Sequence, residues 1–127
     1  MIEVLRSISS VAVVGVSDKP DRASHVVARY LIENTNWTVY LVNPMVSDTL
    51  GRQVYPSLKD LPAVPDCVDV FRRVEDADAV LDEAIEVGAK VFWLQLGVAS
   101  EELKAKGEAA GLTVVMDKCL KIELEQH

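Results

Sequence analysis

The loop that follows the first apolar run carries the residues best suited to bind an anion. Gly15 has no side chain and would let a ligand approach the backbone. Ser17 and Ser24 offer hydroxyl groups, and Lys19 and Arg22 offer positive charge. The first N–H groups of the helix that follows are expected to point into the same space. This combination predicts a phosphate site.

Arg22 is the residue in this loop that can form paired hydrogen bonds with a phosphate group. A helix end alone stabilises an anion by roughly 0.3–1 kcal/mol, whereas micromolar binding requires about 8 kcal/mol. Arg22 can alternatively lie solvated on the first helical turn. A positive charge beside the positive end of a helix is unfavourable, so the position favours an anionic partner.

The sequence is a poor match to an NAD site. Of the three glycines in the usual GxGxxG turn, only Gly15 is present, and the second apolar strand ends in Asn43 instead of an acidic residue. A neutral residue there would not repel a phosphate group on the ribose. A nucleotide with a phosphorylated ribose therefore fits better.

Other reactive side chains have more than one reading. His25 adjoins the anion loop without a suitably spaced carboxylate, which favours a packing or hydrogen-bonding role over general base catalysis. Cys119 is either an inert, partly buried thiol or, with Lys118 and Lys121 nearby, a thiolate able to exchange with a disulfide. Intact-mass measurement after incubation with a small-molecule disulfide separates these two readings. Cys67 begins an apolar strand and is expected in the core.

Apolar periodicity predicts the elements that must position these residues. Strands are expected at 11–16, 37–42, 67–71, 91–96 and 112–116, and helices at about 22–34, 74–87 and 100–110. Residues 53–55 are expected either to add a short strand or to remain a loop, and 122–127 to form a short polar tail. Asp69 interrupts its strand and is expected to face a loop or an edge.

Alternating strands and helices indicate a parallel sheet with helices on both faces. We expect one α/β domain over residues 1–127, a Rossmann-like three-layer sandwich with a mostly parallel sheet of five or six strands. Ligands of such sheets bind beyond the carboxyl ends of the strands. That rule selects the loops 15–24, 43–52, 71–75, 95–100 and 117–120.

Composition excludes several classes of protein. The chain has 127 residues and a formal net charge of −7, which argues against nucleic-acid binding. Its two cysteines lie far apart, so a zinc ribbon or disulfide framework is not expected, and no metal site is predicted. No apolar run approaches the roughly 20 residues that span a bilayer. We expect a cytoplasmic protein that does not bind membranes.

Six short motifs occur in the order found in a known family. They are Val14-Gly15-Val16-Ser17, Arg22-Ala23-Ser24, Val42-Asn43-Pro44, Val54-Tyr55-Pro56-Ser57-Leu58, Trp93-Leu94-Gln95-Leu96-Gly97 and Met116-Asp117-Lys118-Cys119. Over roughly residues 5–123, the chain resembles single-domain CoA-binding proteins and is similar to the amino-terminal CoA-binding domain of succinyl-CoA synthetase α subunits. Those subunits tend to have lysines after the Asn-Pro pair. Met45 and Val46 stand there in this chain, and Arg52 is a candidate replacement.

The resemblance implies that coenzyme A binds at the carboxyl ends of the strands. The residues that it assigns to the phosphates are Gly15, Ser17, Lys19, Arg22 and Ser24, and Val16 is counted among the cofactor-binding residues. It places Asn43 and Pro44 beside the 3′-phosphorylated ribose and adenosine, Val70, Phe71 and Arg72 along the nucleotide, and Leu96 and Gly97 on the pantetheine path. In the synthetases the phosphorylated histidine belongs to a second domain, so the resemblance gives His25 no such role.

The expected function is non-enzymatic binding of coenzyme A or acyl-CoA, with a regulatory role as one version of it. The alternatives are a subunit or remnant of an acyl-CoA synthetase and an NADP-type dinucleotide-binding protein. A dehydrogenase would need a substrate domain for which 127 residues leave no room. A protein partner or a homo-oligomer is compatible with the sequence.

Overall fold

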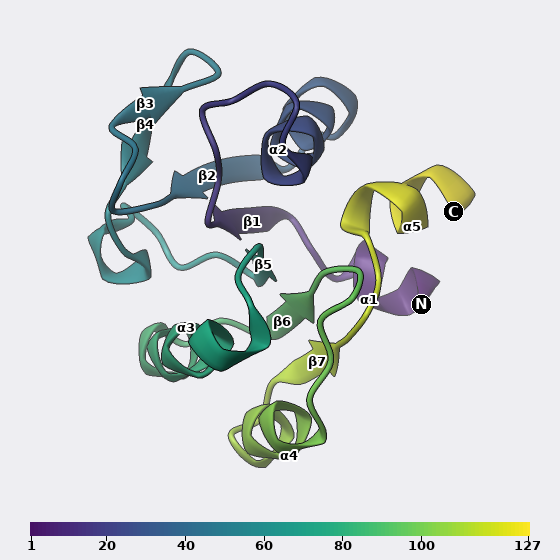
Figure 1. Cartoon of the computed structure of the whole chain (residues 1–127). Coiled ribbons are helices and arrows are strands. Elements are labelled where there is room, and N and C mark those ends of the chain that lie inside the picture. Colours follow the sequence, from purple (N-terminus) through teal and green to yellow (C-terminus); the bar gives the residue numbers. More distant parts are fainter.

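The computed structural model describes residues 1–127 as a seven-stranded sheet between two layers of helices (Figure 1). The strands are β1 (Ser10–Val14), β2 (Thr38–Val42), β3 (Asp48–Thr49), β4 (Arg52–Tyr55), β5 (Cys67–Val70), β6 (Val91–Leu94) and β7 (Thr113–Val115). The helices are α1 (Ile2–Arg6), α2 (Ala23–Asn34), α3 (Val74–Val87), α4 (Glu101–Ala109) and α5 (Leu120–Gln126), with a 3₁₀ turn at Leu58–Asp60. The predicted Rossmann-like α/β sandwich is confirmed.

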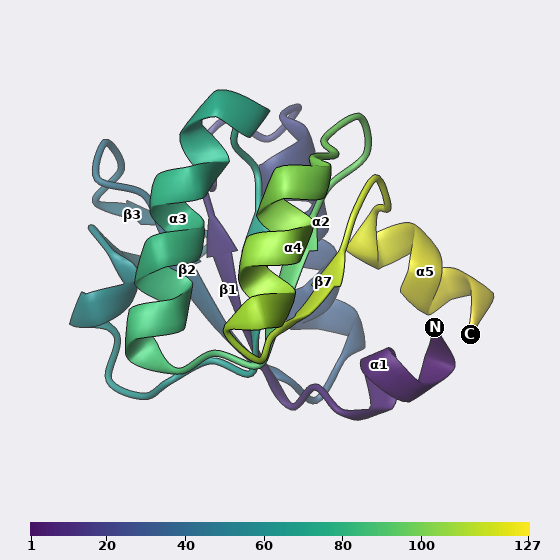
Figure 2. The ribbon, with the colours of Figure 1, turned by 90° about the horizontal axis from the view of Figure 1, so that it is seen from below.

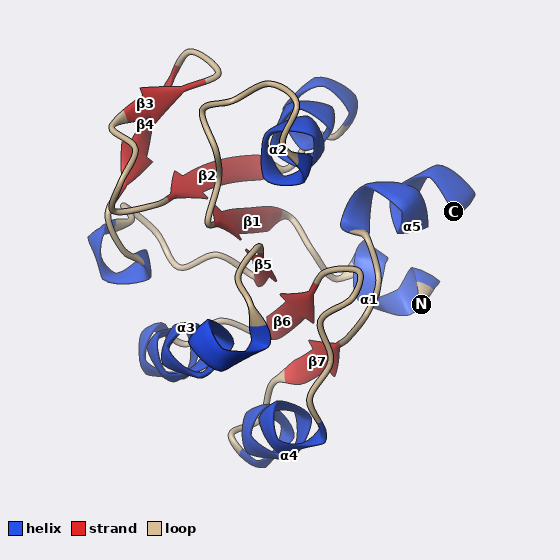
Figure 3. Ribbon diagram, viewed as in Figure 1, coloured by secondary structure: helices blue, strands red, loops and turns tan.

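Strand order determines where the chain can bind a ligand. The order across the sheet is β3-β4-β2-β1-β5-β6-β7, and every pair is parallel except β3 with β4. From β1 the chain first builds outward through β2, then returns to place β5 on the other side of β1 (Figure 3). The loops that leave β1 and β5 therefore diverge, which creates the crevice typical of ligand sites in such sheets.

The sheet is buried on both faces, as the continuous apolar runs predict. Val11 and Val13 of β1 point into the core beneath α2 and α5, whereas Ala12 and Val14 point into the core beneath α3 and α4. Figure 2 shows α3 and α4 lying together across one face of the strands. Both cores must form for the carboxyl edge of the sheet to be held in place.

The sheet has more strands than the five or six expected from the sequence. The short strand considered at 53–55 is β4, and the unexpected seventh strand is β3. The two form a hairpin whose turn residues, Leu50 and Gly51, have φ angles of 54° and 71°. Positive φ at both positions is the geometry of a type I′ turn, which usually carries Asn-Gly or Asp-Gly. Because leucine is unusual at the first position, the sequence does not indicate this turn.

The carboxyl-terminal segment is helical, and the prediction of a polar tail was wrong. Leu120 at the start of α5 is fully buried, Leu124 packs on the same core, and Lys121 lies 5.2 Å from the centre of the Tyr30 ring. One apolar stripe on seven residues is too short to be recognised as a helix without its packing partner.

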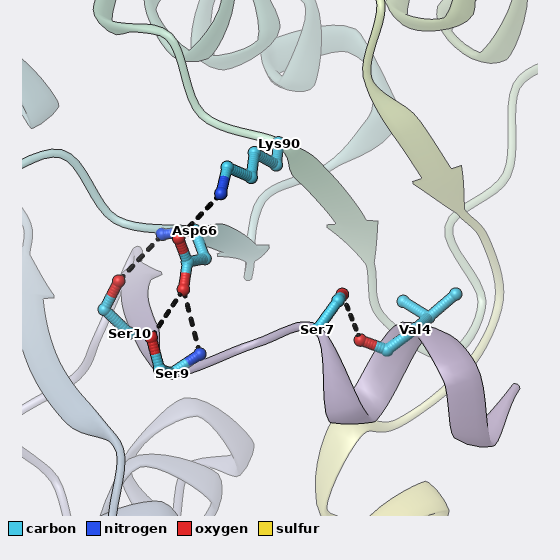
Figure 4. Close-up of polar contacts among 6 residues, drawn as sticks. All are labelled: Val4, Ser7, Ser9, Ser10, Asp66 and Lys90. Carbon is cyan, nitrogen blue, oxygen red and sulfur yellow. Dashed lines mark hydrogen bonds and ion pairs between the residues drawn. The ribbon is translucent and has the colours of Figure 1, made fainter.

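The amino ends of β1 and β5 are joined by a polar cluster around Asp66 (Figure 4). One carboxylate oxygen accepts hydrogen bonds from both the backbone N–H and the hydroxyl of Ser9 at 2.9 Å, while the Asp66 N–H donates to Ser10 Oγ at 2.8 Å. Lys90 Nζ lies 3.9 Å from the second oxygen. These contacts, led by the Ser9 N–H, lower the pKa of Asp66.

Replacing Asp66 with Ala is expected to lower the free energy of unfolding at pH 7 by about 1–2 kcal/mol, since two hydrogen bonds to a charged group are lost. A carboxyl group with a lowered pKa stabilises the fold above pH ~4, and the effect disappears as pH falls through its folded pKa. Urea unfolding of both proteins at pH 7 and pH 3 measures this. Lys90→Ala is the control and should cost about 0.5 kcal/mol or less, because the lysine is 75% exposed. Equal losses in the two variants would contradict the assignment.

Candidate functional site

A cavity of about 330 Å³ lies at the crevice between the loops that leave β1 and β5. Its lining is mainly polar and consists of Gly15, Ser17, Lys19, Arg22, Ala23, Ser24 and Phe71. The five residues that the sequence predicts for a phosphate site are thus brought to one cavity, at the end of the sheet where the strand order reverses.

Position 15 has no room for a side chain, which is a stricter requirement than the sequence suggests. Its φ angle is +89°, and a Cβ at this position would lie less than 3.0 Å from the carbonyl oxygen of Phe71. The backbone of the β5–α3 loop occupies the space that a side chain would need. Gly15 is therefore required for the close approach of two loops, as well as lining the cavity.

The serine hydroxyls hold the loop in shape. Ser24 Oγ accepts a hydrogen bond from the Ser17 N–H at 2.9 Å, and Ser17 Oγ accepts one from the Lys19 N–H at 3.0 Å. His25 Nδ1 lies 2.9 Å from the Ser17 carbonyl oxygen, and the ring is buried. This contact confirms the hydrogen-bonding role predicted for His25. Each hydroxyl still has its own proton to donate to an anion.

The amino end of α2 differs from that of α3 in its charges. Arg22 is the N-cap of α2, no side chain caps that helix, and its first turn contains no acidic residue. Arg73 occupies the same position in α3, but there Glu75 and Asp76 lie 3.4 and 3.2 Å from its Nε. The positive end of α3 is thus balanced by its own acids, whereas that of α2 is open to an external anion.

Asn43 connects the β2 loop to the anion loop. Its side-chain amide donates to the Val16 carbonyl oxygen at 2.8 Å, and its side-chain oxygen accepts from the Met45 N–H at 2.9 Å. Both ends of this buried side chain are therefore engaged within the protein. The geometry makes Asn43 a positioning residue and leaves Pro44 as the exposed member of the pair.

A second, smaller cavity of about 140 Å³ lies on the other side of β1 and β2, under α3. Apolar side chains, among them Val42, Pro44, Leu58 and Val80, form much of its wall, and Arg72 and Glu83 add charge. Arg72 also approaches Gly15, since its Nε would lie 3.4 Å from a Cβ there. Arg72 therefore lies between the polar cavity and the apolar one.

Leu96 and Gly97 lie on the β6–α4 loop, at the same end of the sheet but outside the walls of both cavities. Leu96 is 59% exposed, and the Gly97 N–H donates to Asp117 Oδ1 at 2.7 Å. Because β5 and β6 are neighbours, this loop runs beside the loop that carries Phe71 and Arg72.

Three residues lie where the sequence analysis did not expect them. Val16 and Val70 have no exposed surface, so their side chains cannot line a ligand site. The Val16 carbonyl oxygen accepts the bond from Asn43. Arg52 lies at the amino end of β4, donates to the Val39 carbonyl oxygen at 2.9 Å and is remote from the carboxyl edge, so it cannot replace the missing lysines.

Asp69 is fully buried, and the expectation that it faces a loop or an edge was wrong. It points into the core beneath α2, beside Val13 and Trp93 of the neighbouring strands. Gln95 Nε2 donates to its Oδ1, whereas its Oδ2 has no hydrogen-bond partner. Burial raises the pKa of Asp69 to about 7. The sequence feature that could have indicated this buried carboxyl group is an acidic residue within an otherwise apolar strand.

The two cysteines lie in different environments. Cys67 is fully buried, as predicted, and burial raises the pKa of its thiol well above the usual value. Cys119 is partly exposed at the N-cap of α5, next to the core that contains Trp93 and Leu120. This position is compatible with both readings of Cys119 given by the sequence.

None of the helices is long and apolar enough to cross a membrane.

Comparisons with known proteins agree with this arrangement. The family description "CoA binding domain" matches residues 9–125. The uncharacterized protein YneT of Bacillus subtilis (strain 168) is 39% identical over 120 residues, which cover 94% of this chain and 88% of YneT. A hypothetical protein from Pyrococcus horikoshii OT3 has a structure with 37% identity and a TM-score of 0.93, covering 98% of this chain and 87% of the other.

A larger enzyme contains a similar fold. The dinucleotide-forming acetyl-coenzyme A synthetase 1 of Ca. Korarchaeum cryptofilum, in complex with phosphate and ADP, is 24% identical with a TM-score of 0.76. The match covers 90% of this chain but 27% of the synthetase. At that identity the likeness concerns the fold alone. The family match over nearly the whole chain and the close relatives lead to one conclusion: this chain is a member of the CoA binding domain family.

Proposed function

We propose that this protein binds coenzyme A or acyl-CoA at the carboxyl edge of its sheet without catalysing a reaction on it. The observation that carries the proposal is the polar cavity, where Lys19, Arg22 and the open amino end of α2 converge at the point of strand reversal. Membership of the CoA binding domain family supports the choice of ligand.

The two cavities suit different parts of the ligand. The polar cavity suits the diphosphate, because Arg22 can form paired bonds with phosphate oxygens and α2 supplies N–H groups. The apolar cavity beside Pro44 suits the adenosine end, and Arg72 lies between the cavities where a further phosphate can be neutralised. The pantetheine arm would then leave past Leu96 and Gly97.

The hydrogen bonds at the site support binding without catalysis. Ser17 and Ser24 accept bonds from backbone N–H groups of the same loop, and His25 contacts a carbonyl oxygen instead of either hydroxyl. Activation of a serine nucleophile would require the histidine to accept the hydroxyl proton. These contacts preorganise an anion site.

Arg22→Ala is expected to weaken CoA binding by about 1.5–3 kcal/mol, roughly a 10- to 150-fold rise in Kd, since one charge-assisted contact is lost. Isothermal titration calorimetry measures the change. Arg29→Ala is the matched control, because it removes the same charge from the same helix away from the cavity. Similar losses in both variants would show that Arg22 acts only through net charge.

The identity of the ligand is tested by titrating CoA, dephospho-CoA and NADP in parallel. A neutral Asn43 at the end of β2 and Arg72 between the cavities are expected to favour CoA over dephospho-CoA. Equal binding of the three compounds, or none, would reject selectivity for the 3′-phosphate.

A further inference from the structure

The hydrogen bond between Asp69 and Gln95 is buried within the sheet, and the binding site described above does not use it. Asp69 lies on β5, second from the strand's carboxyl end, and its side chain has no exposed surface. Gln95 is the first residue after β6 and is 7% exposed. Their hydrogen bond joins the middle of the sheet to the start of the β6–α4 loop.

The hydrogen bonding of Asp69 is incomplete. Gln95 Nε2 donates to Oδ1, and Oδ2 is buried without a partner. A neutral carboxyl group tolerates this arrangement better than a carboxylate, because a buried charge with a free oxygen lacks the donors that water would supply. The Gln95 bond favours the carboxylate and lowers the pKa of Asp69, but burial raises that pKa more strongly. Ionisation of Asp69 therefore favours a conformation in which this region opens to solvent.

The β6–α4 loop is the segment that can respond. Gln95 is both the partner of Asp69 and the first residue of the loop, and its carbonyl oxygen accepts the Val98 N–H at 3.0 Å. Gly97 is exposed and is held through its N–H by Asp117. Loop residues have few buried contacts, so local opening there is less costly than separation of the central strands.

We propose that Asp69 is a positioning residue whose contact with Gln95 fastens the β6–α4 loop while the carboxyl group is protonated, and that loss of the proton releases Leu96 and Gly97 and weakens binding of the pantetheine arm. The weaker binding of the pantetheine arm rests on the proposed function. The release of the loop on ionisation of Asp69 does not.

Other titratable groups share this face of the sheet. They are Cys67 on the same strand, His25 on α2, and Cys119 and Lys121 at the start of α5, and Asp117 contacts the loop from the β7 side. All of them remain in an Asp69→Asn variant. That variant keeps an acceptor for Gln95 but cannot ionise, so subtracting its pH profile isolates Asp69.

Hydrogen exchange of the Gly97 and Val98 amides tests the loop in the absence of ligand. After correction for intrinsic exchange, wild-type protection is expected to fall between pH 5 and 7 by up to about tenfold per pH unit, then to level off. In Asp69→Asn it should not change with pH. Gln95→Leu, which removes the donor, should lose loop protection at every pH.

The amide of Val13 in β1 is the internal reference for global unfolding. Ionisation of Asp69 also favours global unfolding, so Val13 protection falls with pH as well. The proposal requires the Gly97 and Val98 amides to respond to Asp69 while exchanging faster than Val13 at every pH, through an opening of their own. Loop amides that exchange no faster than Val13, the same pH dependence in Asp69→Asn, or a wild-type loop that does not respond to pH would each overturn it.

The effect on pantetheine binding is tested with CoA and with 3′-phosphoadenosine 5′-diphosphate, which lacks the pantetheine arm. From pH 5 to pH 7 the affinity of wild type relative to Asp69→Asn should fall for CoA and stay constant for the shorter nucleotide. Equal changes for both compounds would show that ionisation of Asp69 does not act on the pantetheine arm. Binding of neither would reject the proposed function, while the exchange data would still decide the role of Asp69.

Discussion

Asp69→Asn is expected to stabilise the protein above neutral pH by at most about 4 kcal/mol. The pKa of Asp69 rises from 3.8 to about 7 on folding because the carboxyl group is fully buried. A tenfold change in the acid dissociation constant corresponds to about 1.4 kcal/mol of free energy. Asparagine has nearly the same shape and accepts from Gln95, yet it carries no charge that must be buried.

The sign follows from proton linkage. The folded protein holds the Asp69 proton more tightly than the unfolded chain does, so this group's stabilisation is complete below pH ~4 and is lost as pH rises through about 7. The advantage of Asp69→Asn should therefore be small at pH 4, grow up to pH 7 and stay constant above it. Urea denaturation at pH 4, 5.5, 7 and 8.5 measures the difference.

Asp48→Asn is the matched control for this experiment. Asp48 is exposed on the short edge strand β3, and the same substitution there is expected to change stability by about 0.5 kcal/mol or less at each pH. If Asp69→Asn destabilised the protein equally at every pH, the carboxyl group would be an ordinary hydrogen-bonding partner and its burial would carry no charge penalty.

Gly15→Ala is expected to lower the free energy of unfolding by about 2–4 kcal/mol, because two costs combine. An alanine is strained at a φ of +89°, and its Cβ would collide with the Phe71 carbonyl oxygen. Relief of the collision requires the β1–α2 and β5–α3 loops to separate. The same change should therefore weaken ligand binding, because both loops line the polar cavity.

The Gly111→Ala variant measures the cost of the strained backbone conformation without the cost of a collision. Gly111 has a similar φ of +92°, but a Cβ there would meet no atom within 4 Å. This control should lose only about 1 kcal/mol, the cost of the backbone conformation. Thermal unfolding of the two variants checks the difference. Equal losses would mean that the loops move apart freely and that Gly15 is not needed for their approach.

Local patterns predicted the elements that depend on one continuous stretch of chain. The apolar run from Val11 to Val16 and the helix at about 22–34 correspond closely to β1 and α2. The short strand considered at 53–55 is present as β4. The strand β3 and the helix α5 escaped prediction, because Leu50 is an unusual residue for a type I′ turn and α5 is too short to show its period.

The sequence by itself determined the class of fold, the edge of the sheet that can bind a ligand and the presence there of Lys19, Arg22 and two serines. These follow from chain order and hydrophobic period, which are local properties. The tertiary structure decided which hydroxyls are engaged, why Gly15 must lack a side chain and where Asp69 points. Each of these depends on residues that strand pairing brings together from distant positions, and hydrogen-bond partners across a sheet leave no period in the sequence.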